Sequence, residues 1–180
     1  MGASIDTVVT FLEMNARPSH LHFPAPANVK LLLLKAEKPP VHYYRYLYDS
    51  VGRGLYWVDR KKMSDADLAQ AIHVEGVDIY VLHVGGVPAG YFEVDSRRDG
   101  TTELAYFGLI ADFHGLGLGK WFLSEAVNAC WASGEPSRVI VETCTLDGAA
   151  ALPLYQRMGF EPYDRKDKTM QLPEGFTAGM

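Results

Sequence analysis

The segment HGLGLGK, from His114 to Lys120, constrains the fold more than any other stretch, because three glycines recur there at alternate positions. It follows a run of β-forming residues, 102–110, and precedes 120–133, where apolar residues recur at helical spacing. The sequence therefore predicts a strand, a turn and a helix in direct succession. Glycines let the turn approach a ligand closely, and the unpaired amides and positive dipole end of the following helix favour an anion such as phosphate.

Two nucleotide-binding motifs are excluded at this turn. The P-loop pattern GxxxxGK[ST] would need glycine at His114 and serine or threonine at Trp121. The dinucleotide pattern GxGxxG would need a third glycine where lysine or phenylalanine stands. The acetyl-CoA pyrophosphate motif, [QR]xxGx[GA], matches at Gly117 and Gly119, with His114 in place of the usual glutamine or arginine. A tight turn without any ligand is the alternative that the turn alone leaves open.

The remaining patterns predict the elements around this unit. Apolar and β-branched runs predict strands over 7–14, 29–36, 77–84, 87–94, 102–110, 137–145 and 167–172. Gly85-Gly86 predicts the tight turn of a hairpin. Helical spacing with cap and stop residues predicts helices over 41–51, 64–72, 120–133 and 147–158. Strands that come first and then alternate with helices indicate an α/β (α+β) fold, a mixed sheet with helices on both faces.

Length and composition limit the class of protein. The 180 residues suffice for one domain with its own core, and no long basic run suggests a nucleic-acid surface. Cys130 and Cys144 form neither a CxxC pair nor a metal-ligand spacing, so we expect reduced thiols and no metal site. The start of the chain has no signal-peptide pattern, and no apolar run reaches membrane-spanning length. We therefore expect a soluble, cytoplasmic protein.

From Glu93 to Tyr163 the chain resembles the GNAT superfamily of N-acetyltransferases. The resemblance rests on ELAYFGLI at 103–110, FHGLGLGK at 113–120 and ALPLYQRMGF at 151–160, which is similar to the family signature A-xx-(L/F)-Y-xxx-GF. It implies a mostly antiparallel sheet of six or seven strands in a single domain over 1–180. Residues 77–172 would bind acetyl-CoA, and residues 1–76, which carry no matching motif, would shape the acceptor site.

The resemblance also implies roles for individual residues. Backbone groups of the strand ending at Leu109 and Ala111 would hold the pantetheine arm, and the amide of Phe107 would stabilise the oxyanion of the tetrahedral intermediate. Asp147 lies near a position where many members have an asparagine that contacts the cosubstrate. Backbone amides of the turn would hold the pyrophosphate, at Gly115, Leu116, Gly117, Leu118, Gly119 and Lys120, and His114 would occupy the position of the motif glutamine or arginine.

Direct acetyl transfer needs a base for the amine and an acid for the departing thiolate. Tyr155 matches the family tyrosine near the CoA sulfur and is our candidate acid, although a core tyrosine is the alternative. Glu103, at the start of the central strand, is our candidate base, with Glu93 and Glu142 as rivals on neighbouring strands. Cys144 has no basic neighbour in sequence to activate it as a nucleophile. We therefore expect a ternary complex without a covalent enzyme intermediate.

The acceptor is expected to be a primary amine on a small molecule or a peptide. An aromatic cluster over 43–57 either lines its pocket or covers the sheet, and Asp49 and Asp59 would supply counter-charge. Two other functions remain open: a non-catalytic acyl-CoA sensor, and an acyltransferase with a different acyl chain or a protein N-terminus as acceptor. Neither nucleic acid nor membrane is expected as a partner, and exposed sheet edges would allow a homodimer.

Overall fold

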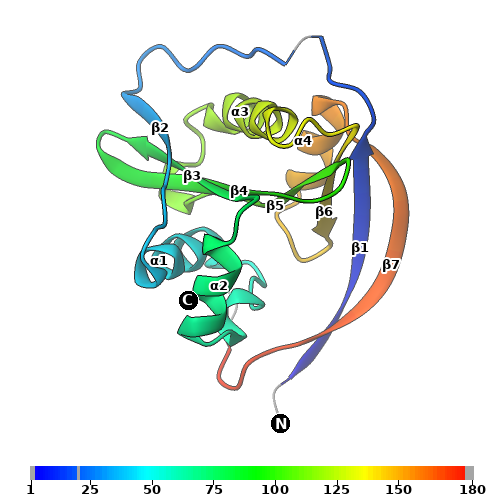
Figure 1. Cartoon of the computed structure of the whole chain (residues 1–180). Helices are drawn as coiled ribbons and strands as arrows, with labels where there is room; N and C mark the ends of the chain where they lie inside the picture. The colour runs from blue at the N-terminus through cyan, green and yellow to red at the C-terminus, as the bar shows by residue number, and fades with distance from the viewer. Residues whose placement is uncertain (1–2, 20, 177–180) are drawn as a thin grey trace.

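The computed structural model describes residues 3–19 and 21–176, and its centre is one seven-stranded sheet (Figure 1). The strand order is β2-β3-β4-β5-β6-β1-β7, and every pairing is antiparallel except β5 with β6. This confirms the mixed, mostly antiparallel sheet expected from the sequence. The strands are β1 (Ser4–Met14), β2 (Leu31–Lys35), β3 (Val77–Val84), β4 (Val87–Arg98), β5 (Thr101–Leu109), β6 (Arg138–Cys144) and β7 (Glu161–Gln171).

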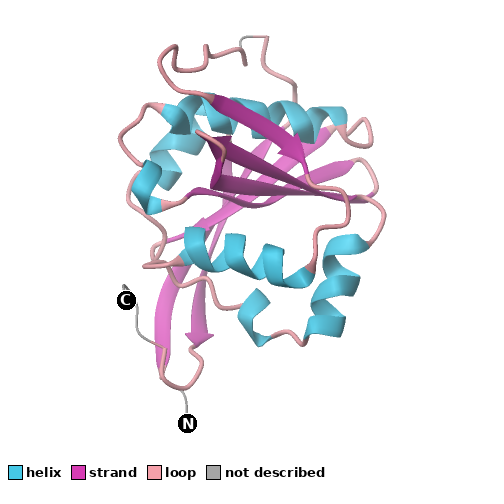
Figure 2. Ribbon diagram, turned by 90° about the vertical axis from the view of Figure 1, so that its left-hand side faces the viewer, coloured by secondary structure: helices cyan, strands magenta, loops and turns pink. Residues whose placement is uncertain are grey.

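Helices cover both faces of the sheet, as expected (Figures 1 and 2). One face carries α3 (Leu118–Ala132) and α4 (Ala151–Met158), and the other carries α1 (Val41–Gly52) and α2 (Asp65–His73). Two short 3-10 turns, η1 (Arg60–Lys62) and η2 (Ala111–Phe113), lie in the connections before α2 and α3. The two helical layers bury two separate apolar clusters against the sheet.

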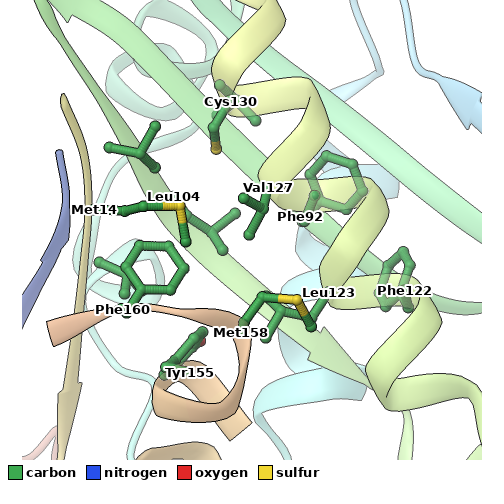
Figure 3. Packing of buried hydrophobic residues seen from close by; sticks show 14 of the residues in the cluster. Met14, Phe92, Leu104, Phe122, Leu123, Val127, Cys130, Tyr155, Met158 and Phe160 are labelled. Carbon is green, nitrogen blue, oxygen red and sulfur yellow. The ribbon is translucent and has the colours of Figure 1, made fainter. Parts of the chain in front are cut away.

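The larger apolar cluster holds α3 against the strands (Figure 3). Phe122 of α3 is fully buried, with its ring centroid 5.5 Å from Phe92 of β4 and 5.1 Å from Phe107 of β5. Tyr155 of α4 packs 5.9 Å from Phe160 in the same cluster. The apolar stripe of α3 therefore fixes this helix over the middle of β4 and β5.

The parallel pairing of β5 with β6 is short. It runs from Thr101 opposite Arg138 to Glu103 opposite Ile140, and both strands continue beyond it without pairing to each other. A β-bulge interrupts the pairing of β4 with β5 near the same point. Glu93 pairs with Tyr106, whereas the next residue of β4, Val94, pairs with Leu104 and skips one residue of β5. The sheet therefore opens between β5 and β6 just after Glu103.

Some predicted boundaries were wrong. β7 begins at Glu161 rather than at 167. The prediction missed its first residues because they are mostly charged and exposed and show no alternation of apolar and polar side chains. Helix α4 begins at Ala151 rather than at Asp147, whose carboxylate instead accepts hydrogen bonds from Thr143 Oγ1 (2.6 Å) and the Cys144 amide (2.9 Å). Asp147 therefore closes the turn after β6 and does not open the helix.

Candidate functional site

The glycine turn has the backbone geometry of an anion cradle. Gly115 and Gly117 have φ of 78° and 74°, and Gly117 is the N-cap of α3 with no side chain capping the helix. A Cβ atom built on Gly115, Gly117 or Gly119 meets no atom within 4 Å, so the turn borders open space. The first amides of a 15-residue helix thus face that space without a side-chain partner.

Side chains around the turn point elsewhere. The Nζ atom of Lys120 lies 4.4 Å from the ring centroid of Phe23, so the lysine charge rests on an aromatic face. Leu118 is buried, whereas Leu116 is exposed. His114, which stands in place of the usual motif glutamine or arginine, has its Nε2 atom 3.0 Å from the carbonyl oxygen of Leu109. The histidine therefore links the turn to the end of β5.

The backbone of β5 presents free groups to the opening. The Ile110 amide donates a hydrogen bond of 2.8 Å to the Ala89 carbonyl. Since residues of an antiparallel ladder alternate between facing and avoiding the partner strand, Gly108 also faces β4, whereas the amides and carbonyls of Phe107 and Leu109 face away from it. The His114 contact to the Leu109 carbonyl agrees with that orientation. Ala111 follows as the first residue of η2 and is exposed.

A cavity of about 430 Å³ lies where β5 and β6 part. Its walls come from both strands, from the start of α4 and from the connection that precedes η1. Four residues singled out from the sequence line it together, namely Glu103, Phe107, Asp147 and Tyr155. The glycine turn is not among the lining residues and lies beyond the far end of β5.

Tyr155 reaches this cavity from α4. Its ring centroid is 6.4 Å from that of Phe107 in an edge-to-face arrangement. Burial raises the pKa of its hydroxyl, and the nearby Asp147 raises the pKa further. The phenol therefore keeps its proton at neutral pH and can donate it, while its buried ring also satisfies the alternative expected from sequence, a core tyrosine.

Glu103 is half-buried at the point where the two strands part. Burial raises the pKa of its carboxyl, and Glu142 on β6 raises it further. Of the rival carboxylates, Glu142 is exposed at the cavity wall, whereas Glu93 is almost fully buried and already paired. Cys144 also lines the cavity and is half-buried. Burial also raises the pKa of Glu93, but its carboxylate is held by Arg60 and Tyr44. Glu103 has a raised pKa, lines the cavity and makes no hydrogen bond or ion pair with the side chain of another described residue, so it is the better candidate base.

Aromatic rings form the wall opposite β6. Tyr48, Trp57 and Tyr106 contact one another with ring centroids 5.3 Å apart in each pair, and Tyr56 extends the wall. The aromatic residues over 43–57 therefore have two different positions. Tyr48, Tyr56 and Trp57 line the cavity, whereas Tyr44 is fully buried against the sheet. Tyr106 was missed by the sequence analysis, because only the pairing of β5 with β4 places it beside the cluster.

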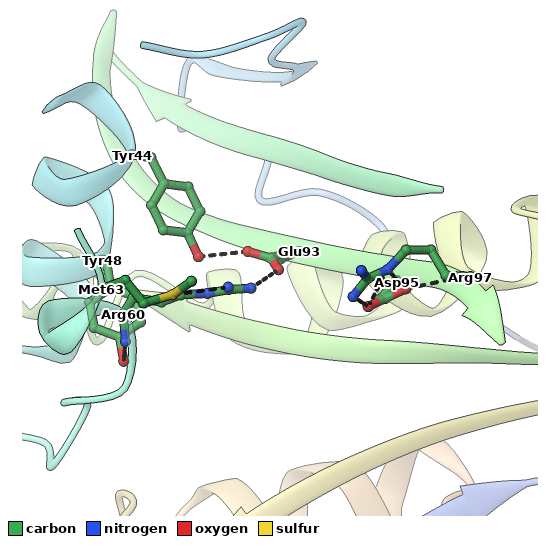
Figure 4. A network of polar contacts seen from close by, with 7 residues as sticks. All are labelled: Tyr44, Tyr48, Arg60, Met63, Glu93, Asp95 and Arg97. Atoms are coloured by element: carbon green, nitrogen blue, oxygen red, sulfur yellow. Dashed lines mark hydrogen bonds and ion pairs between the residues drawn. The ribbon is translucent and has the colours of Figure 1, made fainter. Parts of the chain in front are cut away.

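Buried charges support this wall (Figure 4). Glu93, which is 1% exposed, accepts hydrogen bonds of 2.6 Å from the Tyr44 hydroxyl and from the Arg60 guanidinium. Arg60 also lies 5.3 Å from the ring centroid of Tyr106, and its amide donates to the Tyr48 hydroxyl. No sequence pattern links these residues, so their pairing could not be predicted.

Comparison with known proteins identifies the family. Residues 43–160 match the Acetyltransferase (GNAT) family, which spans more than half of the chain. This protein therefore belongs to the GNAT acetyltransferase family. No curated protein matches the chain.

Solved structures share the fold at low sequence identity. A GCN5-related N-acetyltransferase from Kribbella flavida is 19% identical with a TM-score of 0.60, over 97% of this chain and 61% of that one. A tandem GNAT protein from the clavulanic acid biosynthesis pathway is 19% identical with a TM-score of 0.61, over 92% and 53%. An aminoglycoside N-acetyltransferase in complex with CoA is 12% identical with a TM-score of 0.53, over 77% and 92%.

The chain spans only 53% to 63% of the length of the first four such structures. These likenesses therefore establish the fold and not a substrate. Within the described ranges 3–19 and 21–176, no helix is long and apolar enough to cross a membrane. In the same ranges, no three histidine, cysteine or acidic side chains are grouped as metal ligands.

Proposed function

We propose that this protein transfers an acetyl group from acetyl-CoA to a primary amine by direct attack in a ternary complex. One observation carries the proposal: the cavity where β5 and β6 part brings together a carboxyl with a raised pKa, a protonated phenol and a strand edge with free backbone groups. Glu103 and Tyr155 supply the base and the acid that such a transfer needs. In this proposal residues 77–172 bind acetyl-CoA, and residues 1–76 shape most of the acceptor site.

The residues present fit the cosubstrate. The free backbone groups of Phe107 and Leu109 offer the pantetheine amides a strand-like edge. The turn from His114 to Lys120 offers amides to the pyrophosphate, and the open space at its glycines leaves room for the phosphates. In our proposal, the carbonyl of Leu109 exchanges its contact with His114 for one with the bound arm. Asp147, engaged in its own turn, borders the thiol end of the site.

The proposed chemistry balances. Glu103 takes one proton from the ammonium, directly or through a water, which frees the nitrogen lone pair. The nitrogen then forms a bond to the thioester carbonyl carbon, and the Phe107 amide stabilises the oxyanion. The C–S bond breaks as the thiolate takes the Tyr155 proton, and the second nitrogen proton restores the Tyr155 hydroxyl. One amide, one thiol and one proton on Glu103 result.

The charges of the cavity favour a cationic acceptor. Six carboxylates line it and two cations accompany them, Arg60 and Lys168. Arg60 is already paired with Glu93. An incoming ammonium therefore meets a negative field and aromatic faces, both of which attract it.

Calorimetric titration with acetyl-CoA tests the first step, with NADH and ATP as controls. We expect selective binding of acetyl-CoA that is lost when Gly117 and Gly119 are both replaced by valine. Folded protein that fails to bind acetyl-CoA would overturn the proposal. Release of free thiol with a panel of amines, measured with acetyl-, propionyl- and succinyl-CoA, then separates an acetyltransferase from an enzyme of another acyl chain. Binding without turnover on any amine or peptide N-terminus would instead indicate a sensor.

A further inference from the structure

We propose that Asp59 holds a second positive charge of the acceptor, so that the preferred substrate is an amine carrying another cationic group, of the diamine class. This inference rests on the proposed function and specifies its acceptor. Asp59 borders the cavity from the connection before η1, beside Tyr56 and Trp57. Its carboxylate is exposed and makes no hydrogen bond or ion pair with any other described residue.

The turn that carries Asp59 is fixed from three sides. Arg60 binds Glu93 of β4 at 2.6 Å, Lys61 binds Asp49 of α1 at 3.1 Å, and Lys62 donates to the Gln171 carbonyl at the end of β7 at 2.7 Å. The three consecutive cations are thus each committed to a different element. They hold η1 in place, and Asp59, the residue just before η1, lines the cavity. Figure 4 shows the first of these contacts, between Arg60 and Glu93.

A second clasp comes from α1. The Arg45 guanidinium donates to the carbonyls of Arg60 (3.2 Å) and Met63 (2.8 Å) and binds the Asp65 carboxylate at 2.7 Å. These contacts preorganise the backbone that carries Asp59, which lowers the entropic cost of binding a ligand there. The position of Asp59 is therefore suited to recognition.

The other carboxylates of the cavity have different tasks. Glu93 is neutralised by Arg60, and Asp95 accepts a hydrogen bond of 2.9 Å from Arg97. Glu103 and Glu142 lie on the strands beside the opening, where the proposed function puts the reacting nitrogen. Asp59 lies on the aromatic wall. Burial raises the pKa of Tyr106 to about 12, and the nearby charge of Asp59 contributes to that rise.

The charge of Asp59 fits a second cationic group on the acceptor better than it fits the reacting nitrogen. The reacting nitrogen must lose its positive charge before it can attack, and the carboxylates beside the opening serve that deprotonation. A separate carboxylate among aromatic faces is useful only to a group that stays cationic throughout the reaction. Among the described residues, four carboxylates of the cavity lining have no ion-pair partner, namely Asp59, Glu103, Glu142 and Asp147. The free cation of the lining, Lys168 of β7, is exposed and offsets only one of them.

Steady-state acetylation of butane-1,4-diamine and of butylamine tests this inference. For the unaltered protein we expect a kcat/KM at least tenfold higher with the diamine, since a charged partner typically contributes this much. Asp59→Asn should remove most of that preference through a higher KM for the diamine, with little change for butylamine. Asp99→Asn, which removes an exposed carboxylate far from the cavity in the β4–β5 turn, is the matched control and should keep the preference.

A charge reversal sharpens the test. Asp59→Lys should favour 4-aminobutanoate over the diamine, an inversion that loss of structure cannot produce. Equal kcat/KM for the diamine and butylamine with the unaltered protein, or a preference that survives Asp59→Asn, would overturn the inference. Acetyl-CoA titration of each variant keeps the two proposals apart: binding and amine acetylation without a diamine preference defeat only the role of Asp59, whereas failure of acetyl-CoA to bind defeats the proposed function itself.

Discussion

The hydroxyl of Tyr155 meets the cavity beside Phe107, whose amide is the proposed oxyanion donor. Tyr155→Phe keeps the ring in its packing and removes only the hydroxyl group, and with it the proton that the acid would donate. We expect kcat to fall by roughly 10²- to 10⁴-fold, the range for a general acid, with the affinity for acetyl-CoA unchanged. Turnover and calorimetric titration of the same preparation check this. Unchanged kcat would remove Tyr155 from the mechanism and leave it a core residue.

Glu103 makes activity and stability respond to pH in opposite ways. Because its pKa is raised in the folded protein, activity should rise with pH through that raised value as the carboxylate forms. Glu103→Gln should flatten this acidic limb of the kcat/KM profile and lower its plateau by about 10²-fold or more.

The same raised pKa has a cost in stability. The folded state holds the proton more tightly than the unfolded state, so the stability contributed by protonated Glu103 is lost as pH rises from the unfolded value near 4.5 through the folded one. Glu103→Gln should therefore gain in Tm relative to the unaltered protein across that window. A difference in Tm that does not grow with pH there would contradict the shift.

Whether the sequence could place a residue at the candidate site differed from one residue to the next. Tyr155 and Glu103 could be singled out because short motifs tie them to recognisable elements, and both line one cavity, while their roles stay predictions. The buried pair of Glu93 with Arg60 was not found, since it joins residues 33 positions apart and no local pattern encodes it. Burial of such a pair is decided by the tertiary fold alone.

At the scale of elements, the ring of Phe122 is a central part of the apolar stripe that packs α3 against the sheet. Phe122 lies between Phe92 and Phe107, so Phe122→Ala removes contacts to β4 and β5 together. We expect a loss of about 3–5 kcal/mol in the free energy of unfolding, measured with urea, as for other buried phenylalanines. Leu116→Ala, at an exposed position of the glycine turn, is the control and should cost far less. Similar losses for both variants would contradict this packing.

Elements with strong local signals were predicted well, and elements without them were not. The hairpin of β3 and β4 and the turn before α3 follow from glycine chemistry, and both are present. The first half of β7 lies at an exposed edge and is rich in charged residues, so its sequence pattern favours a loop over a strand. The opening between β5 and β6 was also invisible in sequence, because it depends on where a parallel pairing stops.

At the scale of the whole molecule, the sheet ends in two free edges, β2 and β7. The homodimer expected from the sequence stays a prediction, and β2 is its best candidate surface because Leu32 and Leu34 are 53% and 50% exposed there. Light scattering during size-exclusion chromatography should show a dimer that Leu32→Lys with Leu34→Lys converts to monomer. A monomer for the unaltered protein at every concentration would remove this expectation.

The short pairing of β5 with β6 has a mechanical consequence. In the part of the chain that the structure describes, the ladder between the four strands on one side and the three on the other consists of three residue pairs. A pantetheine arm lying along β5 would form hydrogen bonds with its free backbone groups and would make the sheet more rigid where β5 and β6 part. Amide hydrogen exchange in β5 and β6 should then slow when acetyl-CoA binds, so that the molecule is more rigid while it reacts than while it waits for its substrates.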